Sequence, residues 1–232
     1  MYKASFVLLT CVLAAAQVHA QAVELIPFRD TTPVAASSAY NNNSRPPSAA
    51  CDIDNLNSAT QWMSSGFRWV DRDDHDKGTT GDNSPWIAFY FDDLYVLDHM
   101  NVRNFTESDG GRGIKLVNIW VSVTGNDDDW TPAFAEPVVF TSGVYQDWSN
   151  DGKWTPYDPQ TVNFNGVEAM AVKFEILSNI YSNNFKTPED DVNATIAGVG
   201  GVQFFGTPVP EPATMTLLAL GGLAMLRRKW PA

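Results

Sequence analysis

The chain has 232 residues, 44% of them hydrophobic, which is enough for one domain with a proper core. Its formal net charge is −12. Four of its 15 Lys and Arg lie in two terminal signal segments, whereas all 27 acidic residues lie between residues 24 and 211, so the central part carries about −16. This field repels phosphate backbones and argues against a nucleic-acid partner, although most of the charges simply favour solubility.

The first 20 residues have the order of a secretory signal peptide. Lys3 precedes an apolar core at residues 6–16, and a small-x-small site predicts cleavage after Ala20 by the general secretion machinery. A buried first helix is the alternative. Cys11 leaves with this segment, so Cys51 remains alone and no intramolecular disulfide is expected. Cys51 is most simply a small buried hydrophobe; an intermolecular bridge and a catalytic thiol are the alternatives.

The remaining body is predicted to be all-β. Residues 21–37 indicate one strand, near residues 23–28, and a loop. In residues 114–123, Val and Ile at odd positions alternate with Asn118, Trp120 and Ser122, so Val117 to Val123 should share a face. Further short strands are predicted at residues 86–91, 96–102, 138–140, 161–164, 170–176 and 202–205. Many short strands without a long amphipathic helix favour a sandwich or jelly roll.

Several motifs in order resemble the discoidin-like family, also called coagulation-factor C-type or galactose-binding-like. They are Cys51-Asp52-Ile53-Asp54, Thr60-Gln61-Trp62-Met63-Ser64, Pro85-Trp86, Arg112-Gly113-Ile114, Asp129-Trp130-Thr131 and the run from Gly200 to Gly206. The resemblance covers residues 38–206. It implies a jelly-roll β-sandwich of about eight strands that binds ligands with loops at one end. Apart from the resemblance, Trp62, Trp86 and Trp120 are expected to pack in the core or on the sheet.

A turn near the start of this region is the best metal candidate. Oxygen atoms of Asp54, Asn57 and Thr60 suit a hard cation, and the resemblance implies a structural Ca²⁺. Two departures from the family are visible: Asn55 stands where Gly is usual, with Thr60 one position late, and Gly201 replaces an acidic residue. The alternative is that Asp54 and Thr60 cap the turn through backbone hydrogen bonds.

Aromatic residues in predicted loops are the candidate ligand contacts. An aromatic face can stack on the C–H face of a sugar, and exposed aromatics in loops need such a reason. His75 lies in an acidic run at residues 71–76 that could contact a ligand or a metal, or form a solvated loop; residues 127–129 indicate a hairpin turn. The ligand candidates are Trp69, His75, Trp148, Trp154 and Tyr181.

The C-terminal segment, residues 207–232, has a three-part order. Pro210, Glu211 and Pro212 precede an uncharged run at residues 213–226, which is shorter than the roughly 20 residues that span a bilayer. Arg227, Arg228 and Lys229 would hold its end at the cytoplasmic face. The tail resembles the PEP-CTERM sorting signal, which implies a short hydrophobic sorting helix, a transient stay in the inner membrane and cleavage by an exosortase. A single-pass anchor and a buried helix are the alternatives.

The sequence therefore predicts an exported cell-envelope or exopolymer-associated protein that binds carbohydrate and is not an enzyme. No nucleophile elbow, phosphate loop or zinc spacing is present, and the only cofactor expected is Ca²⁺. A structural matrix or surface protein without a specific small ligand is the main alternative. Polysaccharide hydrolysis and ice binding are less favoured, because no carboxylate pair stands out and no regular Thr array occurs.

Overall fold

The computed structural model describes residues 22–31, 33–39, 45–54, 56, 61–64, 84–106, 111–147, 153–180 and 196–210. The predicted signal peptide and most of the sorting tail lie outside these residues. Within them, the chain forms strands and one short 3-10 helix, η1 (Pro47–Cys51), which confirms the all-β prediction. No helix in the described ranges is long and apolar enough to cross a membrane.

Eleven strands occur in the described residues, where the sequence predicted about eight, because five of them are edge strands of two or three residues. The short ones are β1 (Glu24–Leu25), β2 (Val34–Ala36), β3 (Trp62–Met63), β6 (Thr131–Pro132) and β7 (Val138–Val139). The longer ones are β4 (Trp86–Asn104), β5 (Ile114–Ser122), β8 (Val144–Asp147), β9 (Lys153–Pro156), β10 (Gln160–Asn179) and β11 (Gly198–Pro208). Residues 21–37 thus contribute β1 and β2 to the main sheet.

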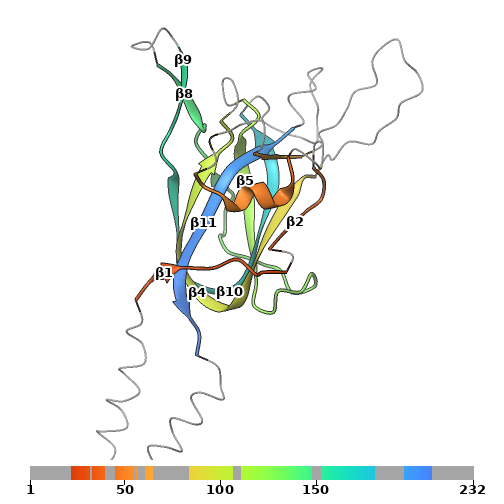
Figure 1. Cartoon of the computed structure of the whole chain (residues 1–232). Coiled ribbons are helices and arrows are strands. Elements are labelled where there is room, and N and C mark those ends of the chain that lie inside the picture. Colours follow the sequence, from red (N-terminus) through yellow and green to blue (C-terminus); the bar gives the residue numbers. More distant parts are fainter. Residues whose placement is uncertain are drawn as a thin grey trace, which may run out of the picture.

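One antiparallel sheet folds over into two layers because β4 and β10 run through both (Figure 1). The first half of β4 pairs with β2 and with residues 171–175 of β10, whereas its second half pairs with β11 and with residues 160–169 of β10. The pairs of strands predicted at 86–91 and 96–102, and at 161–164 and 170–176, are therefore single bent strands. The exposed Asp92 and Asp93 resemble a turn in sequence, but the chain bends there without leaving the sheet.

Aromatic side chains join the two layers. Phe204 of β11 packs against Phe89 and Phe91 in the first half of β4, with ring centroids 5.5 and 5.1 Å apart. Trp62 is fully buried, as predicted. Trp86, which was predicted to pack in the core or on the sheet, lies on the outer side of the sheet, where it and Trp130 pack over the buried Ala88 and Ala171. Burial of this kind of apolar surface is the main stabilising contribution to the fold.

Two predictions about single side chains differ in outcome. Val123 was expected to share a face with Val117, which is fully buried, but β5 ends at Ser122 and Val123 is 48% exposed. Cys51 packs against the core, as predicted for a small hydrophobe, and burial raises the pKa of its thiol to about 12. It is a free cysteine.

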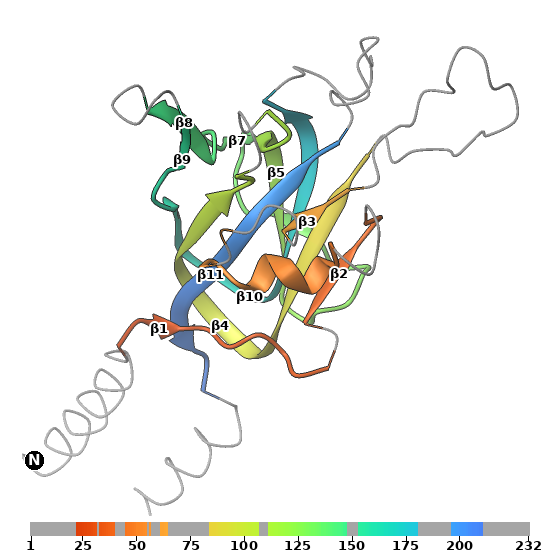
Figure 2. The ribbon, with the colours of Figure 1, turned by 45° about the horizontal axis from the view of Figure 1, so that its top comes forward.

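Both chain ends leave the fold at the same end of the sandwich. Strand β1 pairs with the last part of β11, placing Glu24 opposite Gly206, and the Val209 N–H donates to the Leu94 carbonyl at 2.8 Å. Figure 2 shows β1 and the end of β11 side by side near the bend of β4. The 11 residues of β11 span about 35 Å, so its first residue, Gly198, lies at the opposite end.

Candidate functional site

Strand ends gather at the end of the sandwich opposite the chain termini, and each borders a segment outside the described residues. Ser64 precedes segment 65–83, Ile180 precedes segment 181–195, and Ala197 closely follows it. The Ser64 N–H donates to the Ala197 carbonyl at 2.7 Å, and the Ile180 N–H donates to the Gly113 carbonyl at 2.9 Å. The starts and ends of these segments are thus held together by backbone hydrogen bonds.

Asn104, at the end of β4, is the central polar side chain of this arrangement. Its Nδ2 donates to the carbonyls of Ile114 (2.6 Å) and Thr141 (2.7 Å). Its Oδ1 accepts from the N–H groups of Phe105 and Ile114, both at 2.9 Å. Asn104 is only 4% exposed, and its one amide satisfies four backbone groups, three of them in buried residues, and joins three stretches of chain.

Three further buried polar side chains do the same for neighbouring strand ends. Oε1 of Gln61 accepts from the Thr106 N–H at 3.0 Å. Oγ of Ser64 accepts from the Ala197 N–H at 3.0 Å, and Nδ2 of Asn179 donates to the Ile196 carbonyl at 2.6 Å. Sequence reasoning missed these residues, since a polar residue at the end of an apolar run looks the same whether it faces solvent or holds a loop.

The β8–β9 hairpin leaves from beside this network. A Cβ on Gly143 would lie 2.4 Å from the Phe105 carbonyl oxygen, so only glycine allows this close approach. The Tyr157 N–H donates to the Gly143 carbonyl at 2.9 Å, and Nη1 of Arg103 donates to the Tyr157 carbonyl at 2.7 Å. The hairpin that bears Trp148 and Trp154 is therefore fastened to the end of β4.

Most predicted ligand residues fall outside the described residues. Trp69 and His75 belong to segment 65–83, Tyr181 to segment 181–195 and Trp148 to segment 148–152. Trp154 lies in β9, where its backbone pairs with Gln146. The structure brings the starts and ends of these segments to one end of the sandwich; the contacts that their side chains make with a ligand stay predictions.

The predicted calcium turn is described at Asp54, whereas Asn57 and Thr60 lie outside the described residues. The Asp54 N–H donates to Oδ1 of Asp52 at 3.1 Å, so Asp52 rather than Asp54 caps this part of the turn. Nε of Arg103 donates to the Ile53 carbonyl at 2.8 Å, so a guanidinium already occupies one approach of a cation to that oxygen. Asp54 itself is exposed and offers a carboxylate to solvent.

Gly201 explains one departure from the discoidin-like pattern. A Cβ there would lie 2.4 Å from both the Asp52 carbonyl oxygen and the Ile53 Cα. The turn packs directly on β11, so an acidic side chain cannot occupy this position without moving the turn. Among the described residues, no group of three His, Cys, Asp or Glu side chains is placed to hold a metal ion.

The predicted hairpin turn at residues 127–129 connects β5 to β6, and its acidic residue is used structurally. Asp129 accepts hydrogen bonds from the Ser122 hydroxyl and from the Thr124 N–H and hydroxyl. These hydrogen bonds lower the pKa of Asp129 below its usual value, and the bond from Ser122 has the largest effect.

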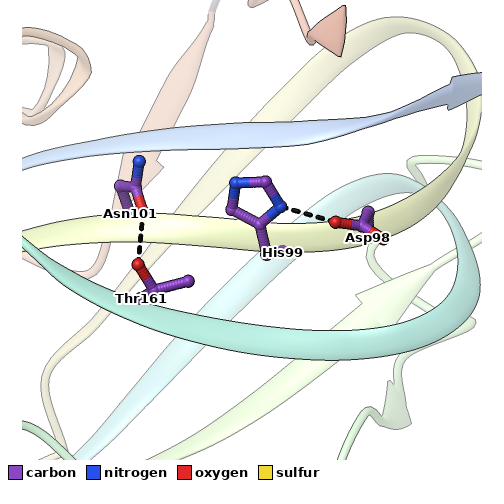
Figure 3. A network of polar contacts seen from close by, with 4 residues as sticks. All are labelled: Asp98, His99, Asn101 and Thr161. Atoms are coloured by element: carbon purple, nitrogen blue, oxygen red, sulfur yellow. Dashed lines mark hydrogen bonds and ion pairs between the residues drawn. The ribbon is translucent and has the colours of Figure 1, made fainter. Parts of the chain in front are cut away.

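A second polar cluster lies on the outer face of β4, away from the loop-bearing end (Figure 3). Nδ1 of His99 lies 2.6 Å from Oδ2 of Asp98, and the Thr161 hydroxyl donates to Oδ1 of Asn101 at 2.9 Å. The His99 ring stacks on Phe205 of β11, with centroids 4.5 Å apart. The Thr161–Asn101 and His99–Phe205 contacts join β4 to its neighbours β10 and β11, whereas the Asp98–His99 contact lies within β4.

Comparison with known proteins identifies the tail. Residues 208–229 match the PEP-CTERM protein-sorting motif, which confirms the prediction for the C-terminal segment and marks the chain as an exported protein sorted at the membrane. No curated protein matches the chain significantly.

Solved structures similar to the chain include three β domains. The F5/8 type C domain of a Bacteroides fragilis protein has 14% identity and a TM-score of 0.49, covering 76% of this chain and 91% of its own. A family 32 carbohydrate-binding module from C. perfringens, in complex with galactose, has 13% identity and a TM-score of 0.49, and the match covers 79% of this chain and 99% of the module. A module from a family 31 glycoside hydrolase of Clostridium perfringens has 17% identity and a TM-score of 0.49, covering 77% and 94%. The likeness is distant, so what this chain binds has to be argued from its own residues.

Proposed function

We propose that this chain is an exported, non-enzymatic module of the cell envelope or exopolymer that binds carbohydrate with the segments at its loop-bearing end. An exosortase would process its tail during a transient stay in the inner membrane, leaving the module on the cell surface or in the extracellular matrix. The observation that carries the proposal is that three segments, each with at least one aromatic residue, start and end together beside a buried polar network. Because hydrogen bonds hold the ends of these loops in place, the loops lose less conformational entropy when they bind a ligand.

The chemistry of the candidate residues suits a sugar. The rings of Trp69, Trp148 and Trp154 can cover the C–H face of a pyranose, as can that of Tyr181, while His75 can hydrogen-bond its hydroxyl groups. The acidic surface favours a neutral polysaccharide over an anionic one, because like charges repel. Trp62 does not compete for this role because it is fully buried, and Trp130 packs on the outer sheet face.

A structural Ca²⁺ belongs to the same proposal. Asp54 would hold it together with Asn57 and Thr60, and the ion would supply rigidity to the turn rather than chemistry. The exposed Asp54 carboxylate supports this assignment, whereas the Arg103 contact to the neighbouring carbonyl and the glycine at position 201 weigh against a tight site.

A glycan array tests the proposal on purified protein starting at Gln21, with and without Ca²⁺. Neutral polysaccharides should bind, and Trp69→Ala with Trp148→Ala should weaken binding at least about tenfold, or about 1.4 kcal/mol. The matched control is Trp130→Ala on the outer sheet face, which should bind like the parent protein. An array without hits would count against the proposal and favour a structural matrix protein, whose deletion changes biofilm texture without sugar binding.

A further inference from the structure

The sorting motif begins inside the folded sheet. The match to the motif starts at residue 208, and Pro208 is the last residue of β11, paired with Tyr95 of β4. The next residue, Val209, is still hydrogen-bonded to Leu94. No spacer therefore separates the folded module from its sorting signal.

The connection from the fold to the uncharged run is short. Four peptide units lead from Val209 to Ala213, so at most about 14 Å separates their Cα atoms. When the run at residues 213–226 is inserted in the membrane, the end of β11 must stay within this distance of the point where the run enters the bilayer. The bend of β4 at residues 92–94, which lies beside Val209, is then the first part of the module to meet the lipid headgroups.

The N-terminal end of the module lies beside the same exit point. Leu25 of β1 is paired with Phe205 of β11, and the Ile26 N–H donates to the Phe204 carbonyl at 2.8 Å. The predicted signal-peptide cleavage after Ala20 leaves only three residues before β1. Before cleavage, both membrane-directed segments would therefore leave the module side by side.

We propose that this end of the sandwich, formed by β1, the end of β11 and the β4 bend, faces the membrane surface while the tail is inserted, so that the loop-bearing end points away from the lipid. The side chains of Glu24, Asp92 and Asp93 at this end are all exposed. Anionic headgroups repel such carboxylates within a Debye length of about 8–10 Å. The tail alone holds the module against the lipid, and cutting the tail releases it.

Lipid-dependent fluorescence quenching tests this orientation in the chain from residue 21 to 232. In a Cys51→Ala background, a dye is attached at Asp93→Cys, in the bend of β4, or at Ser84→Cys, two residues before β4 begins, and both positions are exposed. Their separation along the strand is about 25–30 Å. In phosphatidylcholine vesicles with spin-labelled headgroups, the dye at position 93 should be quenched several-fold more than the dye at position 84. Asp92→Cys repeats the test should Asp93→Cys fold poorly.

Two control variants test whether the short, membrane-inserted tail causes the difference in quenching between the two dyes. Leu218→Arg with Leu220→Arg, in the uncharged run, should abolish vesicle binding and quenching, because charged side chains are strongly disfavoured in the middle of a membrane. A flexible Gly/Ser insertion of about 12 residues after Pro210 should erase the difference between the two dyes. Equal or reversed quenching in the parent chain, or a difference that survives the insertion, would overturn the proposal. The glycan array does not depend on this outcome, so the two proposals fail separately.

Discussion

Replacing Asn104 with Ala is the sharpest test of the buried polar network. The substitution removes the side-chain amide and leaves the N–H groups of Phe105 and Ile114 and the carbonyls of Ile114 and Thr141 without these hydrogen bonds. Each bond contributes about 1 kcal/mol net, and each buried group left unpaired costs about 1–3 kcal/mol, partly relieved by water entering the space. We expect Asn104→Ala to lower the free energy of unfolding by about 3–5 kcal/mol.

Urea denaturation followed by tryptophan fluorescence measures this change as a shift of the midpoint at a constant slope. Asn101→Ala is the matched control, because Asn101 lies on the same strand but faces outward, with its one described bond going to Thr161. That variant should lose at most about 0.5–1 kcal/mol. Equal losses in the two variants, or a loss below about 1 kcal/mol for Asn104→Ala, would refute the assignment of Asn104 as the residue that holds the strand ends.

Three further predictions concern the turn, the thiol and the cation. Gly201→Ala should lower the unfolding free energy in urea by about 2 kcal/mol or more, because its Cβ would lie 2.4 Å from the Asp52 carbonyl oxygen; an unchanged midpoint would contradict the close contact. Native Cys51 should resist alkylation at pH 8, since burial raises the pKa of its thiol to about 12. The contribution of this shift to the free energy of unfolding should be present below pH 9 and be lost as the pH rises toward 12. Rapid labelling of the folded protein would contradict this by showing an exposed thiol. Ca²⁺ should raise the melting temperature of the parent protein and of Asp158→Ala but not of Asp54→Ala; no shift in any of them would remove calcium from the proposal.

Patterns of neighbouring residues in the sequence were enough to predict the fold class and the nature of the tail. In residues 170–176 the period of two predicts one shared face for Met170, Val172, Phe174 and Ile176, because it depends only on neighbouring residues. The last three are in the core, whereas Met170, beside the register shift between Ala169 and Ala171, is only half-buried. The sorting motif was also readable directly, since its proline, apolar and basic parts follow one another in the chain.

Features that depend on distant pairings could not be found in this way. The bend at Asp92 and Asp93 looked like a break between two strands, because sequence alone does not show that β10 continues the pairing on both sides of it. Gly201 looked like a lost metal ligand, until the packing of the turn against β11 gave it a steric reason.

Asn101 and Asn104 show most clearly which features can be predicted from the sequence and which depend on the tertiary structure. They are the same residue type, three positions apart on β4, and an odd spacing along a strand puts their side chains on opposite faces. The alternation of β4 could therefore separate them into two faces. Only the tertiary structure, which brings Ile114 and Thr141 to the inner face, makes one asparagine the hydrogen-bonding centre of the loop-bearing end and leaves the other on the surface.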